Sequence, residues 1–449
     1  MPSKKNILLI NPWIYDFTAF DFWLKPLGLL YIAALLKKHT DYQLSFIDCL
    51  DRHHPGILQK LRDLPDGRGS FPKEEVTKPE VLKSVPRKFS RYGLPLSLFL
   101  QELKSVPSPD VVLLGCTMTY WYPGVQQVVE FIRSQIGQVP VVLGGVYATL
   151  MPEHARRFSG VDIVVEGHGE KKIFPLLRDI LGDSSTIPDQ NETLDDLPPP
   201  AFEFLRNKET FPFLTSRGCP FRCSFCAGPI LCPDFEQRQP SSIVDEIEKL
   251  HAVFGNRHLA FYDDALLLDK KCRIIPVLEG LIEKKLPLSF HTPNGLHIRE
   301  IDTEMATLLK KANFQSLFLS QESFDERVLA ERSPKVSPRD LKRALISLQQ
   351  AGYSRQEINV YLMVGLPEQD ISSIKEDILR VQGLGARPRL AYFSPVPGTE
   401  EWRKMIEKGQ IDEDADPLLH NKLTFPYLWG DLSPKDYAEI KNLLTKPEA

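Results

Sequence analysis

Residues 211–229, FPFLTSRGCPFRCSFCAGP, run from an apolar segment that predicts a β-strand into a loop with three cysteines at C-x3-C-x2-C spacing. Cubane iron–sulfur clusters usually take four thiolate ligands, and structural zinc ions also take four ligands. Three thiolates therefore leave one metal position open, and an open position is where a catalytic metal site binds its substrate. Gly218 and Pro220 let the loop backbone wrap a bulky ligand.

Strands and helices alternate downstream of the cysteines as far as about residue 400. Helical periodicity separates short apolar runs, for example at 242–254 and 303–312. The runs predict six strands, at 211–216, 258–264, 288–291, 316–323, 358–366 and 389–395. Six βα units predict a partial (β/α)6 barrel of the TIM type, whose active site lies at the carboxyl ends of the strands. The cysteine loop falls at such an end.

Residues 1–181 show a second, independent series of strands and helices. Five apolar runs predict strands at 6–11, 42–48, 111–116, 141–145 and 161–167. An open parallel sheet covered by helices on both faces, of flavodoxin-like or Rossmann-like type, fits this order. We expect a solvated basic insertion at about 52–105, an interdomain linker at 182–210, the barrel at 211–400 and a helical extension at 401–449.

The composition bounds the classes of function. The chain has 449 residues, of which 42% are hydrophobic and 25% charged, and its formal net charge is -4. These values are typical of globular proteins, and the small net charge indicates no general electrostatic attraction to nucleic acid. The sequence also contains no apolar run of membrane-spanning length. Seven cysteines, an odd number, favour reduced thiols in the cytoplasm over a disulfide framework, and no secretory signal is expected at the start.

The cysteine motif, with Phe225 before its last cysteine, resembles the radical S-adenosylmethionine (SAM) superfamily in both spacing and context. The resemblance implies that Cys219, Cys223 and Cys226 hold a [4Fe–4S] cluster. It also implies that the amino and carboxylate groups of SAM chelate the fourth iron, where one electron releases a 5′-deoxyadenosyl radical. Cys232 is an alternative fourth ligand, although a structural thiol is the simpler interpretation.

Later motifs match the same superfamily in the same order. Asp263 and Asp264 end the second predicted strand of this half, where the superfamily holds the amino group of SAM. "LSQES" and "VGLPEQ" end two further predicted strands, and "FSPVPGTE" resembles the last strand of the superfamily. Many members of the superfamily have glycine after the proline of the Gly-Leu-Pro motif, where this chain has Glu368. The resemblance assigns SAM contacts to Phe225, Asp263, Asp264, Ser320, Glu322, Gly365, Leu366 and Pro367.

The first half resembles the cobalamin (B12)-binding domain that precedes the radical module in one class of the superfamily. The matching stretches are "ILLINP" with "PLGLLYIAALL", then "GCTMT", "LGGVYAT" and "VVEGHGE". Glycines allow a close approach to the corrin or to its nucleotide tail, and hydroxyls offer hydrogen bonds. The residues that the resemblance assigns to cobalamin are Thr117, Thr119, Gly144, Gly145, Val146, Gly167 and His168.

Two features near this domain leave alternatives open. "DRHHPG" (Asp51, His53, Gly56) fits the Asp-x-His-x-x-Gly pattern whose histidine ligates cobalt, but it follows the second strand rather than the first. His53 is therefore either a cobalt ligand or part of a polar loop, and we favour the loop. Trp13 and the aromatic residues 120–122 either face the corrin or pack in the core, and we favour packing.

The leading hypothesis is a cobalamin-dependent radical SAM enzyme that methylates an unactivated carbon of an unknown small molecule or peptide. The first alternative is a radical SAM enzyme of the same class that catalyses a rearrangement, cyclisation or C–C bond formation. A distant alternative is a zinc-stabilised binding protein without turnover. The resemblance also implies an electron donor such as flavodoxin or ferredoxin, and we expect neither a nucleic-acid partner nor a membrane span.

Overall fold

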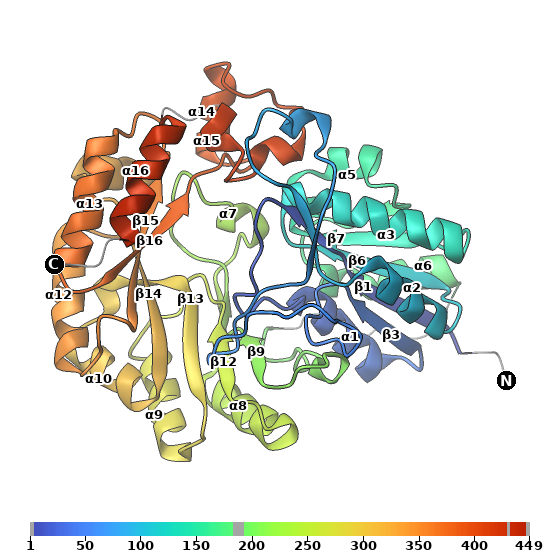
Figure 1. Ribbon diagram of the computed structural model, residues 1–449. Helices are drawn as coiled ribbons and strands as arrows, with labels where there is room; N and C mark the ends of the chain where they lie inside the picture. The colour runs from blue at the N-terminus through green and yellow to red at the C-terminus, as the bar shows by residue number, and fades with distance from the viewer. Residues whose placement is uncertain (1–3, 183–192, 429–431, 446–449) are drawn as a thin grey trace. The chain divides into compact units, whose positions relative to one another are not determined.

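The computed structural model describes residues 4–182, 193–428 and 432–445. The chain forms two compact units, shown in Figure 1. Unit 1 comprises Met1–Lys208 together with Asp414–Leu419, and unit 2 comprises Glu209–Glu413 with His420–Ala449. None of the helices in the described ranges is long and apolar enough to cross a membrane.

Unit 1 is built on a five-stranded parallel sheet in the order β3-β1-β6-β7-β8. Its strands are β1 (Asn6–Asn11), β3 (Gln43–Asp48), β6 (Val111–Cys116), β7 (Val141–Gly145) and β8 (Ile163–Val164). Its α-helices are α1 (Leu27–His39), α2 (Leu96–Ser105), α3 (Tyr122–Gln135), α4 (Val146–Leu150), α5 (Pro152–Phe158) and α6 (Ile173–Leu181). The order confirms the predicted open sheet, although β8 keeps only two residues of the predicted strand 161–167.

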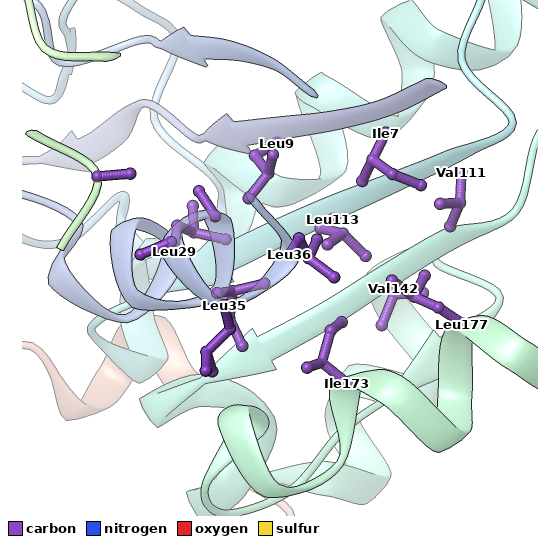
Figure 2. Packing of buried hydrophobic residues seen from close by; sticks show 14 of the residues in the cluster. Ile7, Leu9, Leu29, Leu35, Leu36, Val111, Leu113, Val142, Ile173 and Leu177 are labelled. Carbon is purple, nitrogen blue, oxygen red and sulfur yellow. The ribbon is translucent and has the colours of Figure 1, made fainter. Parts of the chain in front are cut away.

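The core of unit 1 lies between the sheet and the helices α1 and α6 (Figure 2). Leu36 and Leu177 extend from these helices toward Val142 and Leu113 on the strands, and all four are buried. Fully burying one such aliphatic side chain contributes about 1.5–3 kcal/mol. The unbroken run of buried residues from Leu29 to Leu36 explains why α1 could be recognised from the sequence alone.

The predicted solvated insertion is instead a folded part of unit 1. Strands β2 (Ile14–Asp16), β5 (Ser90–Tyr92) and β4 (Lys73–Glu75) form an antiparallel sheet in the order β2-β5-β4. Phe71, Leu82 and Phe89 are buried within this region. Charged residues between these apolar positions obscured the pattern, because a strand of three residues is too short to show a period.

The described part of the predicted linker, residues 193–208, also packs within unit 1. Residues 183–192 lie outside the described ranges, but from residue 193 the chain belongs to unit 1. Leu194, Ala201 and Leu205 are buried, and the backbone N–H of Ala201 donates to the carbonyl of Leu30 at 3.1 Å. The single-turn 3-10 helices of unit 1 are η1 (Glu80–Leu82), η2 (Thr119–Trp121), η3 (Gly169–Lys171) and η4 (Phe202–Phe204).

Unit 2 contains a six-stranded parallel sheet in the order β16-β15-β14-β13-β12-β9, as expected for a partial barrel. Its strands are β9 (Thr210–Phe213), β12 (His258–Phe261), β13 (Ser289–His297), β14 (Phe314–Glu322), β15 (Ile358–Val364) and β16 (Arg387–Tyr392). The helices between successive strands are α8 (Pro240–Phe254), α9 (Ile274–Lys284), α10 (Thr303–Lys311), α11 (Glu326–Arg332), α12 (Pro338–Gln350) and α13 (Ile371–Gly383). Figure 1 shows α10, α12 and α13 along the outside of this sheet.

Several of these helices begin where a short polar side chain caps them. Asp302, Asp370 and Thr399 accept hydrogen bonds from first-turn amides, and Ser337 and Asp340 form a reciprocal capping box. The remaining elements of unit 2 are β10 (Ser216–Arg217), α7 (Gly228–Leu231), β11 (Glu236–Gln237), η5 (Ile298–Glu300), α14 (Glu400–Glu407), α15 (Phe425–Leu428) and α16 (Pro434–Thr445), while η6 spans Pro417–His420.

Candidate active site

The cysteine loop of unit 2 follows the carboxyl end of β9. Its stem is the antiparallel pair of β10 and β11, which pairs Arg217 with Glu236. Gly218 begins the loop with φ +76°, and a Cβ there would lie 2.4 Å from the carbonyl oxygen of Asp234. Only glycine fits this close approach, so the stem determines where the loop starts. Cys232 lies in the same loop, after α7.

The three motif thiols are free and differ in exposure. Cys223 is buried, Cys219 is partly buried and Cys226 is open to solvent. Desolvation among the surrounding protein atoms raises the pKa of all three thiols, and the ammonium group of Lys335 opposes that rise. Within the described ranges, no three His, Cys, Asp or Glu side chains lie close enough to hold one metal ion.

The predicted acidic pair after β12 divides into two roles. Asp263 is buried, and its Oδ1 accepts hydrogen bonds from the Thr215 amide (3.0 Å), the Thr215 hydroxyl (2.6 Å) and the Ser216 hydroxyl (2.6 Å). This oxygen thus supports the start of the cysteine loop. Oδ2 of Asp263 is buried without a partner among the described residues, while Asp264 is exposed. These two groups are available to an amino group of a ligand.

The end of β14 carries Glu322, which lies in the left-handed region with φ +68°. Its Oε1 pairs with Nζ of Lys335 at 2.9 Å, and its buried Oε2 lacks a partner within the described part of the chain. Ser320 packs against Gly295, because a Cβ on that glycine would lie 1.9 Å from the Ser320 hydroxyl. Phe225, the aromatic residue of the motif, is partly buried in the loop between Cys223 and Cys226.

Lys335 is a residue that the sequence did not reveal. It follows α11 in the stretch "RSPK", which contains no recognisable pattern, and only 12% of its side chain is exposed. Burial lowers the pKa of Lys335, but Glu322 and the thiols of Cys223 and Cys219 outweigh it and keep the amine charged. Burial, together with the charge of Lys335, lowers the pKa of His297 to about 3. A fixed positive charge therefore faces the cysteines.

The predicted Gly-Leu-Pro turn follows β15 and is held by a buried glutamine. Oε1 of Gln369 accepts from the amides of Gly365 (2.9 Å) and Leu366 (3.2 Å), and its Nε2 donates to the Met363 carbonyl (3.0 Å). Glu368, which follows the proline of this turn, adopts φ +67°. It is in the left-handed region although it has a side chain, and its carboxylate pairs with Lys408 at 3.1 Å.

In unit 1, the residues assigned to cobalamin gather along one edge of the sheet. They lie at or just after the carboxyl ends of β6, β7 and β8, and the carboxyl ends of parallel strands share an edge. Gly145 has φ +94° and Gly167 has φ +68°. Thr117 and Gly145 are exposed, Gly144, Val146 and His168 are partly buried, and Thr119 is buried. The edge therefore presents mainly backbone and one exposed hydroxyl.

The aromatic residues near this edge serve packing. Trp13 is buried against Phe99 with ring centroids 4.5 Å apart, and its Nε1 donates to the Leu94 carbonyl at 2.8 Å. The hydroxyl of Tyr122 lies 3.2 Å from both carboxylate oxygens of Asp416, which unit 1 takes from near the C-terminus. The preference for core packing over a corrin contact is confirmed for Trp13.

His53 anchors a neighbouring segment of unit 1. Its loop follows β3, the outermost strand of the sheet, as predicted. Nε2 of His53 lies 2.8 Å from Nδ2 of Asn207, while Arg206 pairs with Asp51 at 2.9 Å and with Glu102 at 2.7 Å. These groups line a cavity of about 270 Å³ beside β3. The contacts support the polar-loop interpretation over cobalt ligation.

Two family models match the chain over these sites. The model of the radical SAM superfamily matches residues 213–381, from the end of β9 through most of α13. The chain therefore contains a radical SAM domain. The model of a B12 binding domain matches residues 97–173, which include the loops after β6, β7 and β8. The two matches bear out the predicted cofactors, namely a [4Fe–4S] cluster, SAM and cobalamin.

The curated relatives of this chain have low sequence identity to it, but their similarity extends over most of its length. An uncharacterized methyltransferase of Pyrococcus horikoshii is 23% identical over 66% of this chain and 70% of its own length. Cytidylyl-2-hydroxyethylphosphonate methyltransferase of Streptomyces wedmorensis is 22% identical over 98% of this chain and 89% of its own length. The anaerobic magnesium-protoporphyrin IX monomethyl ester cyclase of Cereibacter sphaeroides is 24% identical over 78% of this chain and 55% of its own.

A solved structure shows the same fold. The radical SAM methyltransferase TsrM from Kitasatospora setae, with tryptophan and a SAM analogue bound, superposes with a TM-score of 0.65 at 17% sequence identity. The match covers 90% of this chain and 76% of TsrM. At this identity the likeness supports the architecture alone.

Proposed function

We propose that the protein is a cobalamin-dependent radical SAM enzyme that transfers a methyl group to an unactivated carbon of its substrate. The observation that carries this proposal is the group of three free thiols beside the Glu322–Lys335 pair, in a chain that also has a B12-binding domain. Methyltransferases among its relatives support methyl transfer as the reaction.

Each part of the site in unit 2 has a distinct task in this proposal. Cys219, Cys223 and Cys226 hold the cluster, which supplies the electron that cleaves SAM. Asp264 and the unpartnered Oδ2 of Asp263 accept the amino group of SAM. Lys335 faces its carboxylate, and the Gly-Leu-Pro turn presents backbone groups to its adenine.

In unit 1, the partly buried Gly144, the exposed Gly145 and the exposed hydroxyl of Thr117 receive cobalamin, the methyl carrier. The protein contributes position and exclusion of water, while the cofactors carry the bond chemistry. We also propose a cytoplasmic location, on the basis of seven thiols, and flavodoxin or ferredoxin as the electron donor.

A second candidate function is a radical reaction without methyl transfer. The Cereibacter sphaeroides relative is a cyclase rather than a methyltransferase, and its similarity spans most of this chain. The two functions differ in their SAM products. Methyl transfer yields S-adenosylhomocysteine together with 5′-deoxyadenosine, whereas a cyclisation or rearrangement yields no S-adenosylhomocysteine.

The test is anaerobic reconstitution with iron, sulfide and cobalamin, followed by mass spectrometry of the SAM products in the presence of candidate metabolites. We expect Cys219→Ala, Cys223→Ala and Cys226→Ala each to abolish SAM cleavage. Cys272→Ala is the matched control, because this thiol is exposed and lies outside the loop. Full iron loading and cleavage in any motif variant would refute the proposal.

A further inference from the structure

A buried carboxylate contacts the middle of the cysteine loop. Glu401, in the first turn of α14, is only 1% exposed. Its Oε1 accepts a hydrogen bond from the hydroxyl of Ser224 at 2.7 Å, and its Oε2 accepts one from Nη1 of Arg332 at 3.0 Å. Lys404 lies 3.6 Å from Oε1. Both carboxylate oxygens are therefore engaged, and the negative charge is compensated within the protein.

The partners of Glu401 belong to different parts of the site. Ser224 lies between Cys223 and Cys226, inside the ligand motif itself. Arg332 ends α11, three residues before Lys335, and its Nη2 donates to the carbonyl of Pro367 at 3.2 Å. One carboxylate thus connects the cysteine loop, the segment that carries Lys335, and the Gly-Leu-Pro turn.

Backbone hydrogen bonds reinforce the same junction. The N–H of Glu401 donates to the Ser224 carbonyl at 3.1 Å, and the N–H of Ser224 donates to the Arg332 carbonyl at 3.1 Å. The Sγ of Cys223 also lies 3.7 Å from the hydroxyl of Ser333. The cysteine loop is therefore held on one side by α14 and on the other by the end of α11.

A purely stabilising role accounts poorly for this arrangement. Buried ion pairs contribute little net stability compared with apolar residues of similar volume, because desolvation offsets their attraction. They do impose one geometry, since each charged group tolerates few alternative partners. Here the geometry is imposed on three segments that the proposed reaction requires to be in register.

We propose that Glu401 is a positioning residue for SAM cleavage, acting through Ser224 on the cluster loop and through Arg332 on the turn at Pro367. The inference rests on the proposed radical SAM function. Glu401 touches neither the cysteines nor the turn directly, so its substitution acts on the order of the loop and on SAM together. A displacement of about 1 Å at a reacting centre can lower a rate by roughly 100-fold.

The decisive variant is Glu401→Gln, which keeps the shape and leaves Arg332 without its counter-charge. We expect kcat/KM for SAM in the substrate-free production of 5′-deoxyadenosine to fall by about 10- to 100-fold. Glu401→Asp, which keeps the charge, should retain a higher kcat/KM for SAM than Glu401→Gln. Glu400→Gln is the matched control, because Glu400 is a neighbouring carboxylate that is exposed on the helix surface and pairs with Lys404 at 2.7 Å.

The contacts of Glu401 with Ser224 and with Arg332 should have different kinetic effects. Ser224→Ala removes the link to the loop and should lower kcat with little change in KM. Arg332→Lys removes the fork that reaches both Glu401 and Pro367, and should mainly raise the KM for SAM. Hydrogen exchange of the cluster-free protein gives a readout that needs no cofactor. Amides of residues 219–226 should exchange faster in Glu401→Gln than in the wild type or in Glu400→Gln.

The outcomes are distinguishable. Wild-type protein that holds a cluster but cleaves no SAM would refute the proposed function. Active wild type, with unchanged exchange and unchanged kcat/KM in Glu401→Gln, would refute the positioning role. A lower melting temperature in Glu401→Gln, with normal loop exchange and normal kinetics per cluster, would also overturn it, since that result describes a residue that only stabilises the fold.

Discussion

Replacing Lys335 with methionine removes the ammonium group that faces the cysteines and keeps most of the aliphatic stem. In the wild-type protein this group pairs with Glu322, and the two side chains are only 12% and 10% exposed. Breaking a buried pair by removing one partner costs about 3–5 kcal/mol, because the remaining charge stays unpaired. We expect the value to fall near the lower limit, since both groups retain some contact with solvent.

The same substitution removes the proposed partner of the SAM carboxylate. A hydrogen bond to a charged group contributes about 1.5–3 kcal/mol, which corresponds to a loss of roughly 10- to 150-fold in SAM affinity. The double variant Lys335→Met/Glu322→Gln separates the two effects. It should recover much of the free energy of unfolding, because no charge remains unpaired, but it should not recover SAM affinity.

The assay is a SAM titration of the reconstituted protein, followed through the electron paramagnetic resonance signal of the reduced cluster, together with thermal unfolding of the cluster-free protein. Lys342→Met is the matched control, because Lys342 is exposed on α12. The reasoning would be refuted if Lys335→Met bound SAM as tightly as the wild type, or if the double variant remained as unstable as the single one.

Three further predictions concern cobalamin and pH. Gly144→Val should abolish hydroxocobalamin binding without unfolding unit 1, because the nearest atom to the added Cβ lies 3.9 Å away. Valine at Gly145 is less suitable, since it would strain the backbone at φ +94°. Retained binding of hydroxocobalamin by Gly144→Val in an absorbance titration would contradict the assigned edge. His53→Ala should leave the cobalamin spectrum unchanged, and nitrogen hyperfine structure lost in that variant would show that His53 ligates cobalt. Burial raises the pKa of Asp377 to about 6. The protonated carboxyl therefore stabilises the folded state fully below about pH 4, and this contribution is lost as the pH rises through 6. The free energy of unfolding should fall by about 3 kcal/mol over this range. Asp377→Asn should flatten this part of the stability profile measured by chemical denaturation, and an unaltered slope would show that another group titrates.

Local patterns were sufficient to predict the scaffold and to propose the cluster ligands. The strands β1 and β6 contain unbroken apolar runs of four residues, and such runs are typical of parallel strands buried on both faces. The cysteine spacing lies within eight residues of sequence and needs no tertiary information to be recognised. The glycines that end β7 were found for the same reason, because their conformational role depends on the local backbone.

Longer-range partners could not be predicted in this way. The antiparallel sheet inside the predicted insertion joins strands of three residues, which are too short to show a period. Gln369 was missed because its bonds go to the backbone of a turn, and backbone recognition leaves no sequence motif. Lys335 was missed because its partner Glu322 lies across a loop and a helix.

The sequence by itself determined which residues can ligate a cluster and where the parallel strands lie, because both depend on chemistry and periodicity within a few neighbours. Only the tertiary structure decided how the ligand loop is held. Ser224 and Glu401 are 177 residues apart in the chain, yet their side chains are in hydrogen-bond contact. Such a contact exists only after the sheet has brought the ends of its strands together, since no local preference encodes the distance between them.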